Sequence, residues 1–325
     1  MAERVHPGKA VPSGTTKKAT ATRDAYGEAL LELGRQRNDI VVLDADLSGS
    51  TKTGKFAKAF PDRFFNVGIS EQDLIGTACG LSLTGKLPFA STFAVFETGR
   101  AWEQIRQTVC YSNLNVKLVA THSGITVGED GASHQSLEDI ALMRVLPNMT
   151  VIVPADAHET KQAIHAAADY NGPVYVRLGR AKVPHVMPDQ YTFQIGKSFS
   201  FHSGTDATVV AMGIMVSVAL EAATKLSAEG IDVGVINMST IKPLDNEALL
   251  KASSSCRLIV TAEEHSIIGG LGSAVSEFLS ENNPTRILRT GIRDVFGCSG
   301  SPDELLNLYG LTADNLALSI KEALA

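Results

Sequence analysis

Cysteine is scarce in this sequence and is not arranged in motifs. The four cysteines are scattered along the chain, at Cys79, Cys110, Cys256 and Cys298. No two of them form a Cys-x-x-Cys pair, which excludes the common zinc-finger and dithiol redox motifs. Free thiols in a reducing compartment are the simplest interpretation, and we expect a cytoplasmic protein.

Basic clusters and long apolar runs are also missing. The formal net charge is -6 and the basic residues are dispersed, which argues against nucleic acid or an anionic membrane as a partner. The apolar run DATVVAMGIMVSVAL is too short and too interrupted to span a bilayer. The first residues mix charges with proline and glycine and lack an apolar signal core. We therefore expect residues 1–20 to form a leader rather than a secretion signal.

Strand-like and helix-like segments alternate along the 325 residues, of which 44% are hydrophobic. This alternation predicts mostly parallel sheets with helices on both faces. A section with several prolines and little periodicity interrupts the pattern, which then restarts. We therefore predict an α/β fold of two doubly wound domains. The expected parts are the leader, a first domain over 21–187, a linker over 188–203 and a second domain over 204–325.

Polar residues follow several of the predicted strands, where open α/β sheets bind ligands. The densest segment is THSGITVGEDGASHQS, which contains His122, Glu129, Asp130 and His134 among three glycines. A metal site is one interpretation, but the spacing fits no helical or finger pattern. Caps for neighbouring helices are a second. We favour a ligand-facing loop in which histidine carries a proton or donates a hydrogen bond.

Glu71 stands at the start of the apolar stretch SEQDLIGTACGLSLTG. Ser70 and Asp73 resemble an N-cap with a short-armed capping box, and an acid in the first helical turn is favoured by the helix dipole. The alternative is a carboxylate that is buried for chemistry. Nearby, Phe93 and Phe96 suit ordinary core packing, or an aromatic face on which a flat ring can stack.

Two further features have a structural and a ligand-binding interpretation. The isolated Arg23, Arg177 and Arg180 are either solvent-facing or bind an anion, because the guanidinium fork matches phosphate or sulfonate oxygens. The segment EEHSIIGGLGSAV suggests phosphate binding at a helix N-terminus. It lacks the full GxGxxG spacing and the downstream acid, so we favour a tight turn or an interface.

Three stretches resemble transketolase, and more closely its C-terminal half. They are NVGISEQDLIGTACGLSLTGKLPFASTF, THSGITVGEDGASHQSLEDIALMRVLPNMTVIVPADAHET and, in the second domain, VINMSTIKPLD with TAEEHSIIGGLGSAV. The resemblance covers nearly the whole chain from about residue 20. It implies a pyrimidine-binding domain for thiamine diphosphate, followed by the C-terminal transketolase domain. The implied activity is transfer of a two-carbon ketol unit from a ketose phosphate to an aldose phosphate.

The motif that anchors the cofactor's diphosphate in this family, GDG followed by an Asn, does not occur in the sequence. The resemblance therefore implies a split enzyme. A second, N-terminal subunit would hold the diphosphate and Mg²⁺ or another divalent cation, most simply in an α2β2 heterotetramer with a homodimeric core. This chain itself is expected to hold no metal.

The resemblance also implies roles for individual residues. Glu71 matches the glutamate that hydrogen-bonds the aminopyrimidine N1′, and His134 matches a histidine beside the substrate carbonyl. Phe96 matches the aromatic residue that stacks on the pyrimidine, Phe93 lines the same pocket, and Asp46 and Leu47 match a stretch that contacts the cofactor. Asp130 matches the acid that recognises a sugar hydroxyl. The positions that match the far phosphate site are Arg23, Ser50, His122 and Arg180.

Two departures from the family pattern affect the substrate and the cofactor pocket. Gly99 stands where an aromatic residue is common, and Ser123 replaces an acid beside His122. The substrate's far end can therefore differ from that of a standard pentose phosphate. Two rivals share the cofactor: the β subunit of a 2-oxoacid dehydrogenase, and an enzyme like deoxyxylulose-phosphate synthase. A third rival is a non-catalytic scaffolding subunit.

Overall fold

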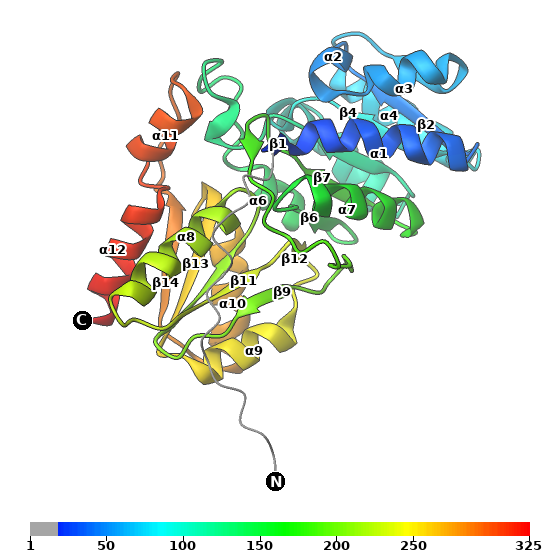
Figure 1. Cartoon of the computed structure of the whole chain (residues 1–325). Coiled ribbons are helices and arrows are strands. Elements are labelled where there is room, and N and C mark those ends of the chain that lie inside the picture. The colour runs from blue at the N-terminus through cyan, green and yellow to red at the C-terminus, as the bar shows by residue number, and fades with distance from the viewer. Residues whose placement is uncertain (1–18) are drawn as a thin grey trace.

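The computed structural model describes residues 19–325. Two α/β units, each built on its own sheet, lie one above the other in Figure 1. Most of the expected leader, residues 1–18, lies outside the described part of the chain. The first described strand, β1 (Thr20–Ala21), pairs antiparallel with β8 (Lys182–Val183). The expected α/β class of two doubly wound domains is confirmed.

The first sheet has seven strands in the order β12-β6-β7-β5-β4-β2-β3. They are β2 (Ile40–Asp44), β3 (Phe64–Asn66), β4 (Leu87–Ser91), β5 (Lys117–Ala120), β6 (Thr150–Ile152), β7 (Val174–Arg177) and β12 (Thr240–Lys242). Every neighbouring pair is parallel except β12 with β6. The predicted parallel sheet is therefore present, with one antiparallel strand at its edge.

Helices cover both faces of this sheet because successive strand residues point to opposite sides. Val41 and Leu43 of β2 belong to one core, and Ile40 and Val42 belong to the other. The helical segments are α1 (Thr22–Gln36), α2 (Ser48–Thr51), α3 (Gly54–Ala59), η1 (Pro61–Arg63), α4 (Glu71–Leu83), η2 (Phe96–Arg100), α5 (Trp102–Gln104), η3 (Ile105–Cys110), η4 (Ile125–Val127), α6 (Asp139–Arg144) and α7 (Ala157–Asp169).

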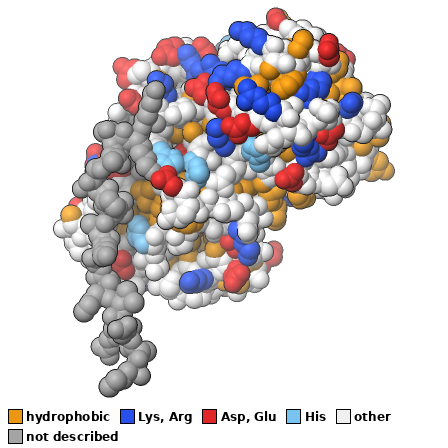
Figure 2. All heavy atoms as spheres, turned by 45° about the vertical axis from the view of Figure 1, so that its right-hand side comes forward, with side chains coloured by type: hydrophobic (Ala, Val, Ile, Leu, Met, Phe, Trp, Pro, Cys, Tyr) orange, Lys and Arg blue, Asp and Glu red, His pale blue; other side chains and the backbone are white. Residues whose placement is uncertain are grey.

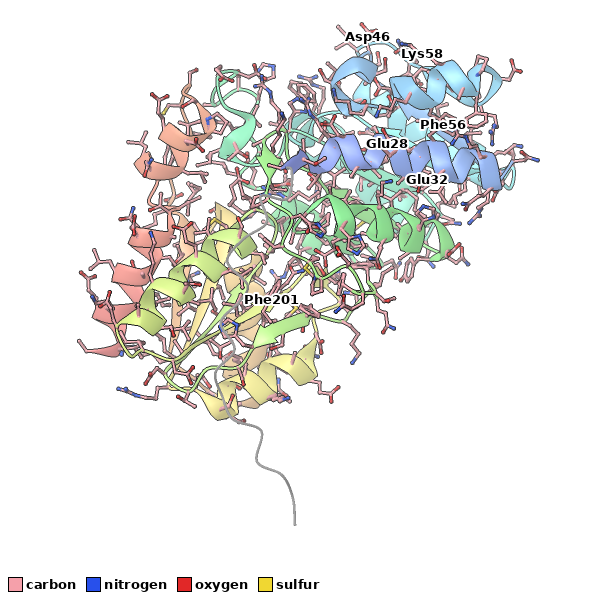
Figure 3. The ribbon with its side chains drawn as sticks, in the orientation of Figure 1. Glu28, Glu32, Asp46, Phe56, Lys58 and Phe201 are labelled. Carbon is pink, nitrogen blue, oxygen red and sulfur yellow. The ribbon has the colours of Figure 1, made fainter. Side chains whose placement is uncertain are left out.

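The helices α1 and α7 lie side by side on one face, as Figure 1 shows. Glu32, labelled on α1 in Figure 3, accepts a hydrogen bond from Lys161 of α7 at 2.9 Å. The segments α4, η2, η3 and α6 pack together on the opposite face. That second face carries the candidate site described below.

The second sheet has five strands in the order β14-β13-β10-β11-β9. They are β9 (Phe199–His202), β10 (Ala207–Ala211), β11 (Val233–Asn237), β13 (Leu258–Ser266) and β14 (Ile287–Ile292). The helices are α8 (Met215–Ala228), α9 (Asn246–Ser255), α10 (Leu271–Asn282), α11 (Pro302–Leu308) and α12 (Ala313–Leu324). All strands are parallel except β9, which runs antiparallel to β11.

Two short strands depart from the expected domain limits. The strand β9 falls within the expected linker over 188–203, yet it forms the edge of the second sheet. The strand β12 comes from the expected second domain, yet it pairs with β6 of the first sheet. The second unit therefore contributes an edge strand to the first sheet, and a simple cut in the sequence does not separate the two sheets.

The surface of the described residues is mixed in character. On the face of the molecule drawn in Figure 2, acidic and basic side chains are interspersed over the first unit. Within residues 19–325, no helix combines the length and the apolar character that crossing a membrane requires.

Candidate functional site

The candidate site lies where three neighbouring strands of the first sheet end. Phe93 follows β4, His122 follows β5, and Arg180 follows β7. Because β4, β5 and β7 are adjacent and parallel, their carboxyl ends meet at one edge of the sheet. A bridge between Phe93 and Thr121 continues the β4–β5 pairing past the strands themselves. This is the edge at which open α/β sheets place ligands.

Glu71 is the first residue of α4, and its side chain is only 2% exposed. Its Oε2 accepts a hydrogen bond of 2.9 Å from Nη1 of Arg100. The predicted cap is wrong in its chemistry: Ser70 occupies the N-cap position, but its side chain makes no capping hydrogen bond. Asp73 accepts instead from Thr77 at 3.4 Å. Glu71 is therefore a buried carboxylate in a first turn, where the helix dipole favours its charge.

Aromatic rings line the space beside Glu71. The rings of Phe93 and Phe96 are nearly parallel, with centroids 5.9 Å apart, and the ring of His134 meets Phe96 edge-on at 5.4 Å. Phe93 is buried and also stacks on His122 at 3.7 Å, so it serves as a packing residue. Phe96 is only partly buried. It therefore offers the aromatic face that the sequence suggested.

His122 is held as a neutral ring. Arg23 can only donate hydrogen bonds, so its Nη1, 3.1 Å away, requires that Nε2 of His122 accept. The proton then resides on Nδ1, which donates to Oγ1 of Thr121 at 2.8 Å. Burial, together with the nearby charges of Arg23 and Arg180, lowers the pKa of His122 to about 3. This histidine is a hydrogen-bonding residue rather than a proton carrier near neutral pH.

A basic cluster adjoins His122. Nη1 of Arg23 also donates to the backbone carbonyl of Ser50 at 3.0 Å. Burial lowers the pKa of Arg23, and the charge of Arg180 contributes to this shift. On its other side Arg180 contacts the carboxylates of Glu129 at 3.2 Å and Asp130 at 3.6 Å. The structure thus brings four of the expected phosphate-site residues into one neighbourhood.

Some sequence-predicted residues lie elsewhere or have other contacts. Asp46 exchanges hydrogen bonds with Asn66 and lies beside α2 in Figure 3, and the amide of Leu47 donates to Asp44. None of these hydrogen bonds involves a residue of the aromatic cluster. The hydroxyl of Ser123 is buried and donates to the carbonyl of Leu178 at 2.9 Å, so it does not face the basic cluster.

Arg177 is neither solvent-facing nor free to bind an anion, which corrects both sequence interpretations. Its guanidinium is buried and donates to the carboxylate of Asp139 at 2.8 Å. It also donates to the backbone carbonyl of Glu264 in the second sheet at 3.0 Å. Arg177 therefore joins the two units.

The glycine-rich turn before α10 is a structural feature, as favoured above. The carboxylate of Glu263 accepts from the amides of Leu271 at 2.7 Å and Gly272 at 2.8 Å. An acid of the chain itself thus occupies the helix N-terminus where a phosphate would bind. Burial raises the pKa of Glu263 to about 7, and the two amide donors oppose that shift.

Sequence reasoning missed Arg100. Its guanidinium carbon lies 4.9 Å from the centre of the Phe96 ring while it bonds Glu71. The sequence did offer one indication of its role. Arg100 directly follows Gly99, the position at which the family commonly has an aromatic residue of the pyrimidine pocket. Within residues 19–325, no group of three or more His, Cys, Asp or Glu side chains is arranged to hold a metal ion.

Comparison with known proteins agrees with this architecture. The family model of the transketolase pyrimidine-binding domain matches residues 18–186, and that of the transketolase C-terminal domain matches residues 196–316.

Individual relatives extend the match to nearly the full chain. A putative transketolase C-terminal section from Methanocaldococcus jannaschii is 52% identical, over 92% of this chain and 95% of its own. The 6-deoxy-6-sulfo-D-fructose transketolase subunit SqwH from a Clostridium species is 40% identical, over 92% of this chain and 93% of its own. A solved split-gene transketolase, described as an inactive β4 tetramer, is 56% identical with a TM-score of 0.87, over 94% of this chain and 98% of its own. This chain belongs to the transketolase family and corresponds to its C-terminal half.

Proposed function

We propose that this chain is the C-terminal subunit of a two-chain, thiamine diphosphate-dependent transketolase. In this proposal it transfers a two-carbon ketol unit from a ketose phosphate to an aldose acceptor. A partner chain supplies the diphosphate site with Mg²⁺ or another divalent cation. The four cysteines are free, which suits a reducing compartment such as the cytoplasm. In the same proposal, residues 21–187 form the pyrimidine-binding domain and residues 204–325 form the C-terminal domain.

The observation that carries the proposal is the buried carboxylate of Glu71 beside the partly open ring of Phe96. An aminopyrimidine needs an acid for its ring nitrogen and an aromatic face for its plane, and these two residues provide both. The guanidinium of Arg100, a flat group with N–H donors, already touches both of them. The buried acceptor of Glu71 and the aromatic face of Phe96 therefore suit the pyrimidine end of the cofactor.

Thiamine diphosphate, when bound, supplies the stabilisation of negative charge that cleavage of a carbon–carbon bond beside a carbonyl requires. The residues of this chain bind and orient. Glu71 holds the pyrimidine nitrogen through a shared proton, and Phe96 supports the ring plane. His134, whose Nδ1 lies 3.0 Å from the hydroxyl of Ser133, stands at the edge of Phe96 and is placed to assist proton transfer on the substrate.

The basic cluster is proposed to bind the far end of the substrate. Arg23 and Arg180 offer N–H groups and positive charge, which suit a phosphate or a sulfonate, and the neutral His122 holds the guanidinium of Arg23 in place. Asp130 is proposed to bind a sugar hydroxyl, as the family pattern suggests. Replacement of the usual acid by Ser123 favours a modified sugar, and one relative carries a sulfonated sugar in its name.

The need for a partner is supported by three relatives' descriptions. One is a C-terminal section, one is a subunit, and the solved homologue of this half alone is described as inactive. We propose an α2β2 heterotetramer around a homodimeric core, in which Asp46 and Leu47 contact the cofactor across an interface.

The test is reconstitution of the purified chain with a purified diphosphate-binding transketolase half. We expect ketol transfer only from the mixture with thiamine diphosphate and Mg²⁺, and we expect Glu71→Ala to abolish it while the circular dichroism spectrum is unchanged. Full turnover by the single chain would refute the requirement for a partner. Consumption of pyruvate instead of a ketose would favour the two cofactor-sharing rivals, and absence of cofactor binding would favour the scaffolding subunit.

A further inference from the structure

We propose that Arg100 is a displaceable latch on the cofactor half-site, which the aminopyrimidine ring must move before it can bind. The proposal rests on the proposed function, because it assumes that Glu71 and Phe96 receive that ring. In this proposal, Arg100 competes with the aminopyrimidine ring for Glu71 and Phe96 and thereby lowers the affinity of the chain for the cofactor.

The first support is that Arg100 occupies both contacts of the ring at once. Nη1 donates to Glu71 at 2.9 Å, and the guanidinium carbon lies 4.9 Å from the centre of Phe96. A guanidinium is planar, carries N–H donors and stacks on aromatic faces, so it reproduces the recognition features of an aminopyrimidine. An aminopyrimidine that bonds Oε2 of Glu71 and stacks on the same face of Phe96 would therefore have to displace the guanidinium.

The second support is that Arg100 has a reason to be there when the half-site is empty. Glu71 is 2% exposed, and a buried carboxylate without a partner is strongly destabilising. The contact with Arg100 compensates that charge. The cofactor ring would take over this role, so the ion pair is needed only in its absence.

The third support is that Arg100 can leave at small cost. Its side chain is 53% exposed, so the guanidinium can move into water while the backbone stays in place. Its own carbonyl is held separately by the side-chain amide of Gln72 at 3.3 Å. Gly99 has no neighbour within 4 Å of where a Cβ would stand, so open space adjoins the latch.

The matched variants are Arg100→Met, which keeps an unbranched side chain without charge, and Arg106→Met as a control. Arg106 lies on the neighbouring η3, and its guanidinium contacts only Gln107 among the described side chains. Affinity for thiamine diphosphate with Mg²⁺ is measured by titration calorimetry on the complex reconstituted with the diphosphate-binding half. We expect Arg100→Met to bind about tenfold more tightly and Arg106→Met to be unchanged.

A second readout uses the isolated chain and no cofactor. Arg100→Met should lower its melting temperature by about 2–4 °C, because Glu71 then lacks a partner. In a Glu71→Gln background the same change should have no effect, since the charge to be compensated is gone. A merely structural role of Arg100 would lower the melting temperature equally in both backgrounds.

The outcomes separate this proposal from the one on which it rests. If wild type and Arg100→Met bind the cofactor with equal affinity, or the variant binds more weakly, the latch is wrong and the proposed function stands. If neither complex binds the cofactor, the proposed function fails and the latch fails with it. Tighter binding by Arg100→Met together with coupling to Glu71 supports the latch.

Discussion

At the scale of single residues, the chain places several ionisable groups in environments that decide their charge. His122 is kept neutral by burial and by a cationic donor, and Glu71 is compensated by Arg100. Glu97, the residue after Phe96, is different. It is completely buried, and within residues 19–325 neither of its carboxyl oxygens has a hydrogen-bond partner. Burial raises its pKa well above the usual range, and the charge of Asp44 adds to that shift.

Glu97 therefore predicts a pH-dependent loss of stability. The native state keeps this carboxyl protonated where the unfolded chain ionises it, above its ordinary pKa of 4.5. The contribution of Glu97 to the free energy of unfolding is then highest at low pH. It falls by up to about 1.4 kcal/mol for each pH unit between the pKa of Glu97 in the unfolded chain and its pKa in the folded chain. We expect Glu97→Gln to unfold at higher urea concentration than wild type at pH 7 and to show little advantage at pH 5.

The control for this experiment is Glu103→Gln, which alters an exposed acid a few residues away. It should leave the pH dependence of unfolding as it is in wild type. Parallel pH profiles of Glu97→Gln and wild type would show that Glu97 is ionised in the native state.

At the scale of elements, the site depends on strand ends and on the glycine-rich loop between β5 and α6. Gly124 in this loop has a φ of +76°, and a Cβ there would lie 2.2 Å from Oε1 of Glu264. That same oxygen accepts the amide of Thr126 at 2.7 Å. The loop therefore packs its backbone directly against an acid of the second sheet, and only glycine permits this approach.

Substitution at Gly124 should reveal both the strain and the clash. We expect Gly124→Ala to lower the free energy of unfolding by about 3 kcal/mol or more, because the added methyl group overlaps a buried carboxylate. Gly85→Ala is the matched control, since Gly85 has a φ of +82° but nothing within 4 Å of its Cβ position. Gly85→Ala should lower the free energy of unfolding only by the backbone strain of a non-glycine residue at positive φ, about 1 kcal/mol. Equal losses in urea denaturation would mean that the loop moves away from Glu264 freely.

At the scale of the whole molecule, the two units are joined by buried polar contacts and by the strand β12, which the second unit contributes to the first sheet. Arg177 of β7 holds Asp139 of α6 and the carbonyl of Glu264 in β13. Tyr175 donates a further hydrogen bond of 2.7 Å to Asp139. With β12 paired to β6, these contacts fix the second unit against the first.

Breaking this junction should destabilise the whole chain. We expect Arg177→Met to lower the free energy of unfolding by about 3–5 kcal/mol, because it leaves Asp139 as a buried charge without its main partner. Lys225→Met, which removes a solvent-exposed ion pair with Asp314, should leave the urea transition unchanged. A small effect of Arg177→Met would mean that Asp139 takes up a proton or that water reaches it.

Much of this architecture could be predicted from the sequence. The alternating pattern indicated two α/β units, and the GISEQ and GEDGASHQ stretches pointed to the transketolase family, which the comparisons confirm. The sheet positions of β9 and β12 were not predicted, because both strands are short and β12 pairs with a strand far away in sequence. Local periodicity carries no information about which sheet such a strand will join.

The sequence by itself determined the fold class, the family and the residue types available to the site, because these depend on local patterns and short motifs. Only the tertiary structure decided how those residues are used. It paired Glu71, at the start of α4, with Arg100, made His122 neutral through Arg23, and placed Arg177 as a link between the units. Each of these contacts joins residues 29 or more positions apart along the chain, so strand order and helix packing set their distances.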